Sequence, residues 1–438
     1  MGNGQCKGYN LLSPIGPGTH AVLLDMDGKI VKEWKDMHGD PVKMLPGGSI
    51  LGYRRSRTGK DPLAPPPKQA APPPPKPGED KSGGPPPRNR PWFDDIDLTQ
   101  VSWDGEEEWS FNNWDDNDTG VMMARWHHDY EREGNPVGYY APGQDFVEKG
   151  KTLLLAHKNT VVPEISDKEL VDDVMYEVDW EGNLTGFEWH PADHFEEYGF
   201  DESARENIYK SPSYNEDRKL GDWLHLNTLS VLGKNHWYDE TGEERFNPEN
   251  IMSSSRGANF IFIISRATGE VVWKCGPDFI EGTPEHNLGQ LVGQHNPHFI
   301  PYGLPGAGNV LVFDNGGTSG YGGSGFPRYT RQYSRIVEFN PVTLEIVWQY
   351  GAEKGDEFFF SHNISNSQRL PNGNTHINEG ANGRIFEVTP DKKIVFDIVS
   401  PFPGPQGSSP RVYRSYRIPP EWVPGNPAGY PEWSSFSE

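Results

Sequence analysis

Two patterns of apolar and polar positions recur along the chain, and the first predicts β-hairpins. In each copy a short apolar strand leads into a turn that holds Asp, Gly or Thr, and a second strand ends in Trp or Phe. Six copies lie at residues 22–34, 101–109, 176–189, 262–273, 336–348 and 385–396. Alternation around such turns is typical of hairpins. The terminal Trp residues are expected to pack between neighbouring sheets and not to form a cofactor site.

The second pattern follows most copies of the first and consists of a polar or His-bearing stretch, a short turn and an apolar strand. Clear examples are residues 44–51, 308–313 and 370–375, whereas the sixth copy has no clear counterpart. Two hairpins make a four-stranded unit, and six such units arranged radially leave only short strand edges exposed. We therefore predict an all-β fold, a single six-bladed β-propeller over residues 1–438 with long loop insertions. A β-sandwich is the alternative.

Insertions interrupt the repeats at four places. Residues 62–91 hold thirteen prolines, which predicts an extended, solvated loop between two strands of the first blade. Residues 191–220 are charged and partly helical in pattern, and residues 234–250 and 316–332 are rich in Gly, Asn or Tyr. Loops of this kind usually cover one face of a propeller, so some are expected to shape the mouth of a site.

Composition supports this fold and narrows the range of partners. Gly (50), Pro (41) and Trp (14) are plentiful, which suits many short strands joined by turns. A net charge of −23 would repel a phosphate backbone, so nucleic acid is not an expected partner. No apolar run is long enough to span a membrane. Cys6 and Cys275 could form one bond, but two cysteines are too few for a disulfide framework or a cysteine zinc site.

Histidines recur at one phase of the second pattern. Just before its strand, successive copies place His38, His127 with His128, His225, His295 and His362. The innermost strand of every blade borders the central channel, so residues at equal phase are expected to meet around one axis. Because neighbouring residues of a strand face opposite sides, only one of His127 and His128 is expected to face that axis. His38 and His362 are closer to ordinary packed side chains.

An asparagine and an arginine accompany the histidines. Asn227 lies two residues after His225, and Arg256 lies one strand later. A buried guanidinium donates two parallel hydrogen bonds, so beside histidine and asparagine it would bind an oxyanion. We therefore predict that these residues and His295 form one functional pocket, which would draw in an anionic substrate despite the acidic surface.

Several short motifs resemble those of the bacterial PAPS-independent arylsulfotransferases. They are Leu24–Trp34, Asp222–Asn227, Ser254–Arg256, Gly269–Trp273, Gln294–His295 and Gln368–Asn374. The resemblance implies a six-bladed propeller that needs no cofactor and transfers a sulfuryl group between small aromatic substrates, from an aryl sulfate to a phenol. It also implies a transient sulfohistidine and a periplasmic or secreted location. The chain has no recognisable signal peptide, so this location is an expectation from the resemblance alone.

The same resemblance assigns roles to individual residues. The expected catalytic residues are His295, His225, Arg256 and His128, and the expected substrate-binding residues are Asn227, His127 and His362. His295 would carry the sulfuryl group, because neutral imidazole is both a nucleophile and a good leaving group. A cationic His225 or His128 would protonate the departing phenolate and later deprotonate the acceptor.

Two other functions fit parts of the pattern. Imidazoles around one axis also bind Zn²⁺ or Mn²⁺ in lyases and hydrolases, with His128, His225, His295 and His362 as the ligands. Arg256 in the same ring argues against a metal, because cations repel one another. A non-catalytic binding propeller would use the Gly-rich loop at 316–333, but it would not explain the repeated histidines.

Overall fold

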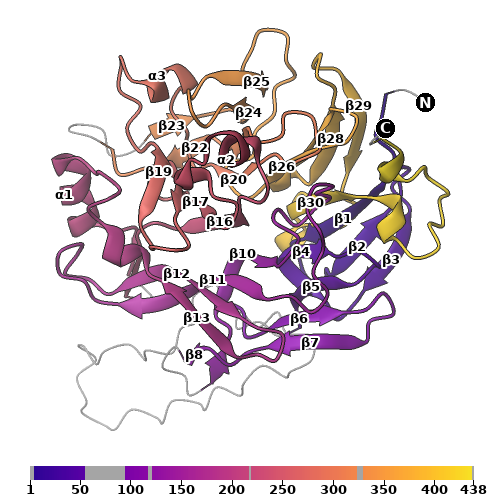
Figure 1. Cartoon of the computed structure of the whole chain (residues 1–438), viewed down its shortest axis with the longest axis horizontal. Coiled ribbons are helices and arrows are strands. Elements are labelled where there is room, and N and C mark those ends of the chain that lie inside the picture. The colour runs from indigo at the N-terminus through magenta and orange to yellow at the C-terminus, as the bar shows by residue number, and fades with distance from the viewer. Residues whose placement is uncertain (1–3, 55–93, 117–120, 217–218, 323–328, 437–438) are drawn as a thin grey trace.

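The computed structural model describes residues 4–54, 94–116, 121–216, 219–322 and 329–436. Within these ranges six β-sheets are arranged radially around one axis, which confirms the six-bladed β-propeller (Figure 1). Each blade contains four antiparallel strands, and the hairpins predicted from the first pattern form its outer half.

In each blade the first-named strand lies at the axis and the last-named strand at the outer edge. The first blade is β30 (Val412–Ile418), β1 (Tyr9–Pro14), β2 (Ala21–Leu24) and β3 (Ile30–Trp34). The second is β4 (His38–Met44), β5 (Ile50–Tyr53), β6 (Leu98–Val101) and β7 (Glu107–Phe111). The third is β10 (Trp126–Arg132), β11 (Thr152–Thr160), β12 (Leu170–Val178) and β13 (Leu184–Trp189), to which β14 (Tyr214–Asn215) and β15 (Leu220–Asp222) are added beside β12.

The remaining blades follow the same order. The fourth is β16 (Leu226–Val231), β17 (Ile251–Ser255), β18 (Phe260–Ile264) and β19 (Val271–Cys275). The fifth is β20 (His295–Phe299), β21 (Val310–Asp314), β24 (Arg335–Phe339) and β25 (Ile346–Tyr350). The sixth is β26 (Asn366–Arg369), β27 (Thr375–Glu379), β28 (Arg384–Val388) and β29 (Ile394–Val399).

The first blade joins the two ends of the chain. Its innermost strand β30 pairs antiparallel with β1, and Tyr9 lies opposite Ile418. The sixth copy of the second pattern is therefore split between the N-terminal and C-terminal regions, which is why it has no clear counterpart in the sequence. This pairing closes the ring of blades, because strands from the two ends of the chain share one sheet.

Five tryptophans link neighbouring blades in the same way. Each lies on the outermost strand of its blade and donates its indole N–H to a carbonyl in the outer turn of the next blade. The donors and acceptors are Trp34 to Ser102, Trp109 to Trp180, Trp189 to Gly269, Trp273 to Pro341 and Trp348 to Pro390, at 2.8–3.2 Å. The predicted packing role is confirmed, and the sixth blade replaces the indole with Phe396.

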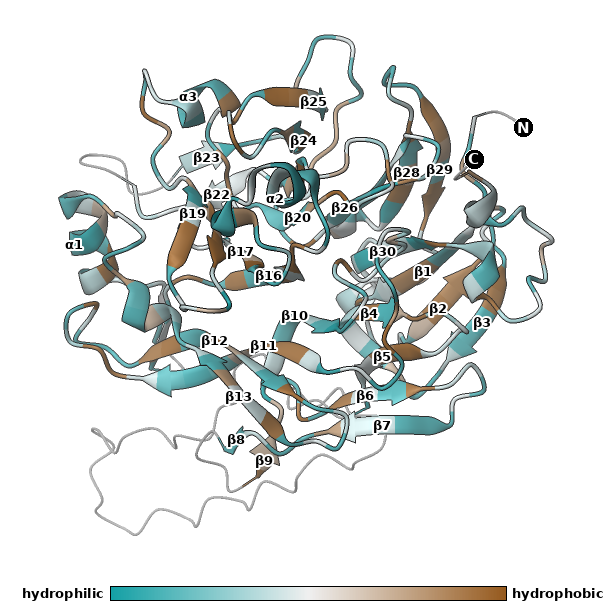
Figure 2. Cartoon of the chain, in the orientation of Figure 1, coloured by the Kyte–Doolittle hydropathy of each residue, from teal (hydrophilic) through white to brown (hydrophobic). Residues whose placement is uncertain are grey.

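Hydrophobic residues are concentrated on the strands and polar residues in most loops (Figure 2), and the buried hydrophobic clusters join residues of neighbouring blades. The axis itself is polar. Beneath the pocket described below, the Asp129 carboxylate accepts hydrogen bonds from Lys43 at 2.6 Å and from Arg414 at 2.8 Å. This buried ion network links the innermost strands β4, β10 and β30, because each charge has a partner.

The insertions add small elements at the rim. They are η1 (Pro191–His194), α1 (Glu202–Lys210), α2 (His236–Thr241), η2 (Glu244–Phe246), α3 (Pro284–Leu288) and the ribbon β22 (Gly317–Ser319) with β23 (Tyr329–Arg331). A second ribbon pairs β8 (Asp115–Asp116) with β9 (Met122–Met123), and short 3₁₀ turns occur at Gly380–Asn382, Pro405–Gly407, Pro420–Trp422 and Trp433–Phe436. The predicted proline-rich loop at 62–91 lies outside the described residues, between the paired strands β5 and β6.

Cys6 and Cys275 are buried free thiols and do not form a disulfide. Burial raises the pKa of the Cys6 thiol to about 12 and also raises the pKa of Cys275. Neither thiol therefore has the thiolate character of a reactive cysteine. In the described part of the chain, no helix has the length and apolar character needed to cross a membrane.

Candidate active site

The innermost strands of blades three to five are bulged at the point where their histidines lie. The pairing register of β10, β16 and β20 with the next strand shifts near the start of each strand. The backbone is left-handed at His128, His225 and Asn296, with φ of 57°, 52° and 51°. A bulge breaks strict alternation of side chains and redirects them. The histidines of three blades are thereby turned towards the axis.

These histidines line one cavity of about 430 Å³ at the axis. Five of the predicted site residues lie in its lining, namely His127, His128, His225, Arg256 and His295. The predicted gathering of residues from separate blades is therefore what the fold produces. On the other side the lining includes Asp40 and Tyr53 of the second blade and Arg411 and Tyr413 of the first.

His295 is held in one tautomer by its hydrogen bonds. Its Nδ1 lies 2.9 Å from the Gly293 carbonyl and 2.7 Å from Asn315 Oδ1. The Asn315 amide group donates to two backbone carbonyls, so its oxygen must face the ring. Both partners of Nδ1 are therefore acceptors, and Nδ1 carries the proton. The lone pair is on Nε2, and burial, with the Arg256 charge, lowers the pKa of His295 well below its usual value.

His225 is paired with a carboxylate. Its Nδ1 lies 2.5 Å from Asp222 Oδ2, three residues earlier in the chain. Burial alone would raise the pKa of Asp222, but the hydrogen bond and charge of His225 lower it below its usual value. Asp222 therefore stays ionised and fixes the orientation of the imidazole, leaving Nε2 for a ligand.

His127 and His128 both line the cavity, so the prediction that only one of them faces the axis is wrong. The cause is the bulge, because the left-handed backbone at His128 breaks the alternation of a regular strand. The two Nδ1 atoms lie 2.7 Å apart. The ring of His128 also lies against His225, with centroids 4.7 Å apart. Burial, with the charge of His225, lowers the pKa of His128 well below its usual value.

Two arginines bring guanidinium groups to the cavity, whose lining also includes the carboxyl groups of Asp40 and Asp95. Arg256 follows β17, as the sequence predicts, and its backbone N–H donates to the His225 carbonyl at 3.2 Å. The β22 ribbon packs against this segment, because Ser319 donates to the Arg256 carbonyl. Arg411, which the sequence analysis missed, donates to Asn363 Oδ1 at 3.1 Å. Guanidinium groups on two sides suit an anion held between them.

Two predicted substrate-binding residues lie outside the cavity lining. Asn227 is fully buried, and its amide group donates to the Gln294 carbonyl at 2.7 Å while its oxygen accepts from Thr228. It therefore joins β16 to the segment before β20 and supports His295 from below. His362 is exposed and lies beside Gly317. Partial desolvation of its ring, with the charges of Arg411 and Arg256, lowers the pKa of His362.

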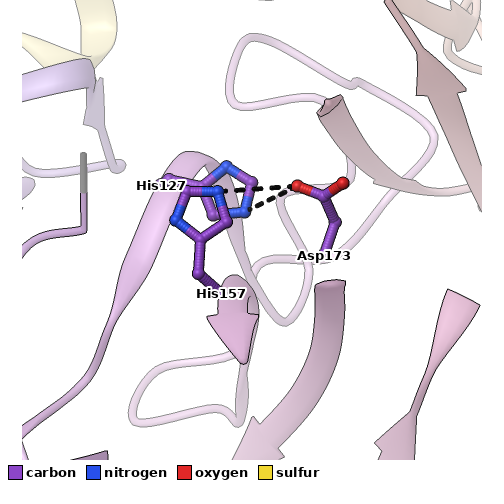
Figure 3. A group of neighbouring side chains, drawn as sticks. All are labelled: His127, His157 and Asp173. Carbon is purple, nitrogen blue, oxygen red and sulfur yellow. Dashed lines mark ion pairs between the residues drawn. The ribbon is translucent and has the colours of Figure 1, made fainter. Parts of the chain in front are cut away.

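Among the described residues, one group of three potential metal ligands has its ligand atoms within 4.8 Å of one another, and it is not the predicted histidine set. It comprises His127, His157 and Asp173 (Figure 3). The two imidazole rings are stacked, with centroids 3.5 Å apart and planes at 7°. A metal ion lies in the plane of each imidazole that binds it. One ion cannot lie in two parallel planes, so this arrangement does not fit a metal centre.

A second cavity of about 560 Å³ adjoins the first and shares Ile15, Asp40 and Tyr53 with it. Its lining is rich in proline, glycine and apolar side chains and contains the His38 ring, which stacks on Tyr53 with centroids 5.6 Å apart. The first cavity is lined by charged side chains, and the second extends it with an apolar lining. Such a pair of cavities suits a small ligand with an anionic part and an aromatic part.

Similarity to solved structures is weak. A protein of unknown function from Bacteroides caccae is 13% identical over 94% of this chain and 99% of that one, with a TM-score of 0.42. AztD from Citrobacter koseri is 8% identical over 94% and 98%, with a TM-score of 0.37. A putative 6-phosphogluconolactonase from Bacteroides fragilis is 9% identical over 93% and 97%, with a TM-score of 0.39. None of these scores supports an argument about function, and the fold is established by the strand pairing itself.

No curated protein matches the sequence significantly. The sequence model of one family does: that of the arylsulfotransferases (ASST) matches residues 143–398, more than half of the chain. The matched range contains His225, Arg256 and His295, whereas His127 and His128 precede it. The chain therefore belongs to the arylsulfotransferase family and is an arylsulfotransferase enzyme.

Proposed function

We propose that the enzyme transfers a sulfuryl group from an aryl sulfate to a phenol through a covalent sulfohistidine at His295. The observation that carries the proposal is the fixed tautomer of this residue. Because Asn315 and Gly293 hold the proton on Nδ1, the Nε2 lone pair is available to attack. The lowered pKa keeps the ring neutral, which is the nucleophilic form.

The reaction has two balanced steps. In the first, His295 Nε2 attacks sulfur, an N–S bond forms, and the S–O bond to the aryl group breaks with its electron pair on the departing phenolate. In the second, the oxygen of the acceptor phenol attacks sulfur and the N–S electron pair returns to Nε2. The proton that the first phenolate gains equals the proton that the acceptor loses, so one acid–base group serves both steps.

The charged residues of the pocket support this chemistry. Arg256 and Arg411 would hold the sulfuryl oxygens, where negative charge is concentrated. His128 or His225 would transfer the proton, since each lies in the lining. The aryl groups would occupy the adjoining cavity, whose apolar lining and stacked His38 and Tyr53 favour an aromatic ring. The proposal includes a periplasmic or secreted location, which rests on the family resemblance.

The test is release of 4-nitrophenol from 4-nitrophenyl sulfate in the presence of a second phenol. Wild-type enzyme should release 4-nitrophenol and form the sulfate ester of the second phenol in equal amounts. His295→Ala should abolish both, whereas His286→Ala, which changes an exposed histidine on α3, should leave both unchanged. Full activity of His295→Ala would refute the proposal.

The metal-dependent alternative has its own outcome in the same assay. The proposed reaction needs no metal, so exhaustive chelation should leave turnover unchanged. Loss of activity on chelation, with recovery on adding Zn²⁺ or Mn²⁺, would favour the alternative function.

A further inference from the structure

A hydrogen bond joins the imidazole rings of His127 and His128, and it constrains which nitrogen of each ring carries the proton. His127 Nδ1 and His128 Nδ1 lie 2.7 Å apart. A hydrogen bond between two ring nitrogens needs one donor and one acceptor. When both rings are neutral, one residue therefore carries its proton on Nδ1 and the other carries its proton on Nε2. The tautomers of the two residues are opposite and change together.

A buried carboxylate stands at the far side of His127. The Nε2 atom of this residue lies 3.2 Å from Asp173 Oδ1 (Figure 3). Both atoms are buried and neither makes a well-aligned hydrogen bond among the described residues, and the Nε2 atom of His157 lies 3.6 Å from the same oxygen. The other carboxylate oxygen, Oδ2, accepts from the Leu226 N–H at 3.0 Å, which fixes the orientation of the group. Asp173, His127 and His128 therefore form a continuous line that ends at the cavity.

The surroundings make a lasting charge on His128 unfavourable. The titratable and charged groups that face the three residues are His157, Asp172, Asp222, His225, His295 and Arg414. Burial and the neighbouring imidazoles lower the pKa of His128, so it does not hold an extra proton by itself. Burial, with the Asp222 charge, raises the pKa of Asp173 well above its usual value, so this carboxyl accepts a proton at a higher pH than an ordinary aspartate.

We propose that Asp173, His127 and His128 form a proton relay in which His128 Nε2 exchanges the proton with the substrate and Asp173 stores it. In the loaded state Asp173 is protonated, His127 carries its proton on Nδ1 and His128 carries its proton on Nε2. When the departing phenolate takes the Nε2 proton, His127 passes its Nδ1 proton to His128 and receives one on Nε2 from Asp173. Asp173 ends as a carboxylate, and no imidazolium forms at any stage.

The acceptor phenol drives the relay in the opposite direction. Its proton enters at His128 Nε2 as its oxygen attacks sulfur, and Asp173 is protonated again. The inference deepens the proposed function, on which it rests, and it assigns the acid–base role to His128. His225 is then free to act on the sulfuryl oxygens. In the relay His127 and Asp173 are positioning residues that act through His128.

Asp173→Asn tests the relay, because the amide preserves the shape and still accepts from Leu226 but takes up no proton. Asp172→Asn is the matched control. Asp172 is equally buried on the same strand, yet its oxygens accept from Trp223 and Ala192 and form no hydrogen bond with His127 or His128. The measurement is the single-turnover rate of phenol release from two substrates, phenyl sulfate and 4-nitrophenyl sulfate. Phenolate is a basic leaving group that needs a proton, whereas 4-nitrophenolate leaves with little protonation.

Asp173→Asn should slow release from phenyl sulfate by about 10²-fold, the usual effect of losing acid catalysis. It should slow release from 4-nitrophenyl sulfate far less, so the dependence on leaving-group pKa becomes steeper. The control should retain the wild-type dependence. Equal losses with both substrates would mean that Asp173 is only structural, and no loss with phenyl sulfate would also overturn the relay.

A second measurement separates the relay from the proposed function. Nitrogen NMR of the resting enzyme reports which ring nitrogen of His128 is protonated. In wild-type protein the proton should move from Nε2 to Nδ1 as Asp173 ionises with rising pH, whereas in Asp173→Asn it should stay on Nε2. A wild-type tautomer that does not change with pH would refute the relay. If no aryl sulfate is turned over, the proposed function fails while this measurement still decides the relay.

Discussion

The two sides of the cavity differ in how their residues are held. On the histidine wall, which consists of His128, His225 and His295, each imidazole is fixed by a hydrogen bond to a neighbouring side chain. On the opposite wall, Tyr53 lines both cavities, and Tyr413 lines the charged one, where its ring meets that of His128 with centroids 6.0 Å apart. The hydrogen bonds of the histidine wall fix the protonation states of its imidazoles, whereas the aromatic rings of the opposite wall fix the shape of the cavity. We infer that chemistry belongs to the histidine wall and selection of the aryl group to the opposite wall.

The largest effects should come from the histidine wall and its arginine. Arg256→Ala or His225→Ala should slow the burst of phenol release by about 10²–10³-fold, the usual loss when one oxyanion contact is removed. Arg411→Ala, on the opposite wall, should cause a smaller loss. Rapid-quench measurement of the burst rate in the three variants would show the order of these losses. A loss for Arg411→Ala that equals or exceeds that for Arg256→Ala would contradict the division between the walls.

The pH dependence of the burst should follow the protonation of His295. Its pKa is lowered by burial and by Arg256, so the neutral nucleophile persists below the ordinary histidine pKa of about 6.5. The burst rate with 4-nitrophenyl sulfate should therefore fall only at a pH below this value. Removing the Arg256 charge should move the inflection to higher pH. An inflection at or above 6.5 in wild-type enzyme would contradict the assignment.

A change on the opposite wall should affect binding and leave chemistry intact. His38→Ala removes the ring that stacks on Tyr53. Aromatic pairs contribute about 0.5–1.5 kcal/mol, so KM for a bulky acceptor such as 4-phenylphenol should rise about two- to tenfold. The burst rate with 4-nitrophenyl sulfate should not change. A lowered burst rate with unchanged KM would place His38 on the side of chemistry.

The smallest effect should come from the rim of the propeller, far from both walls. Trp348→Phe removes the indole N–H that donates to Pro390 in the next blade. Loss of one such hydrogen bond costs about 0.5–1.5 kcal/mol, which should lower Tm by a few degrees without changing turnover. The sixth blade already has Phe396 at this position. A loss of activity at unchanged Tm would contradict a purely structural role.

Repetition is what made the fold predictable. Six similar hairpins identified the blades, and equal phase identified the histidines that line the cavity. The first blade was harder to recognise, because its inner strands come from opposite ends of the chain. As a result Arg411, Tyr413 and Arg414 were missed, although the β-branched and aromatic residues within 412–418 favour a strand.

Local backbone geometry explains the other differences between sequence and structure. Strand alternation separated His127 from His128, but the bulge in β10 brings both to the cavity. Asn227 was expected to bind the substrate, yet its amide group is already used by Gln294 and Thr228. The partners Asp222, Asn315 and Asp173 gave no repeated signal, because each lies at a different phase of its blade. Only Asp222, three residues before His225, was close enough in sequence to suggest a pair.

The most direct test of the central claim is the mass of the enzyme after incubation with an aryl sulfate and no acceptor. The account predicts a gain of one SO₃ group that is labile in acid, that maps to His295 and that disappears when a phenol is added. His295→Ala should show no such gain. A label on His128 or His225, or turnover without any labelled enzyme, would contradict the sulfohistidine at His295.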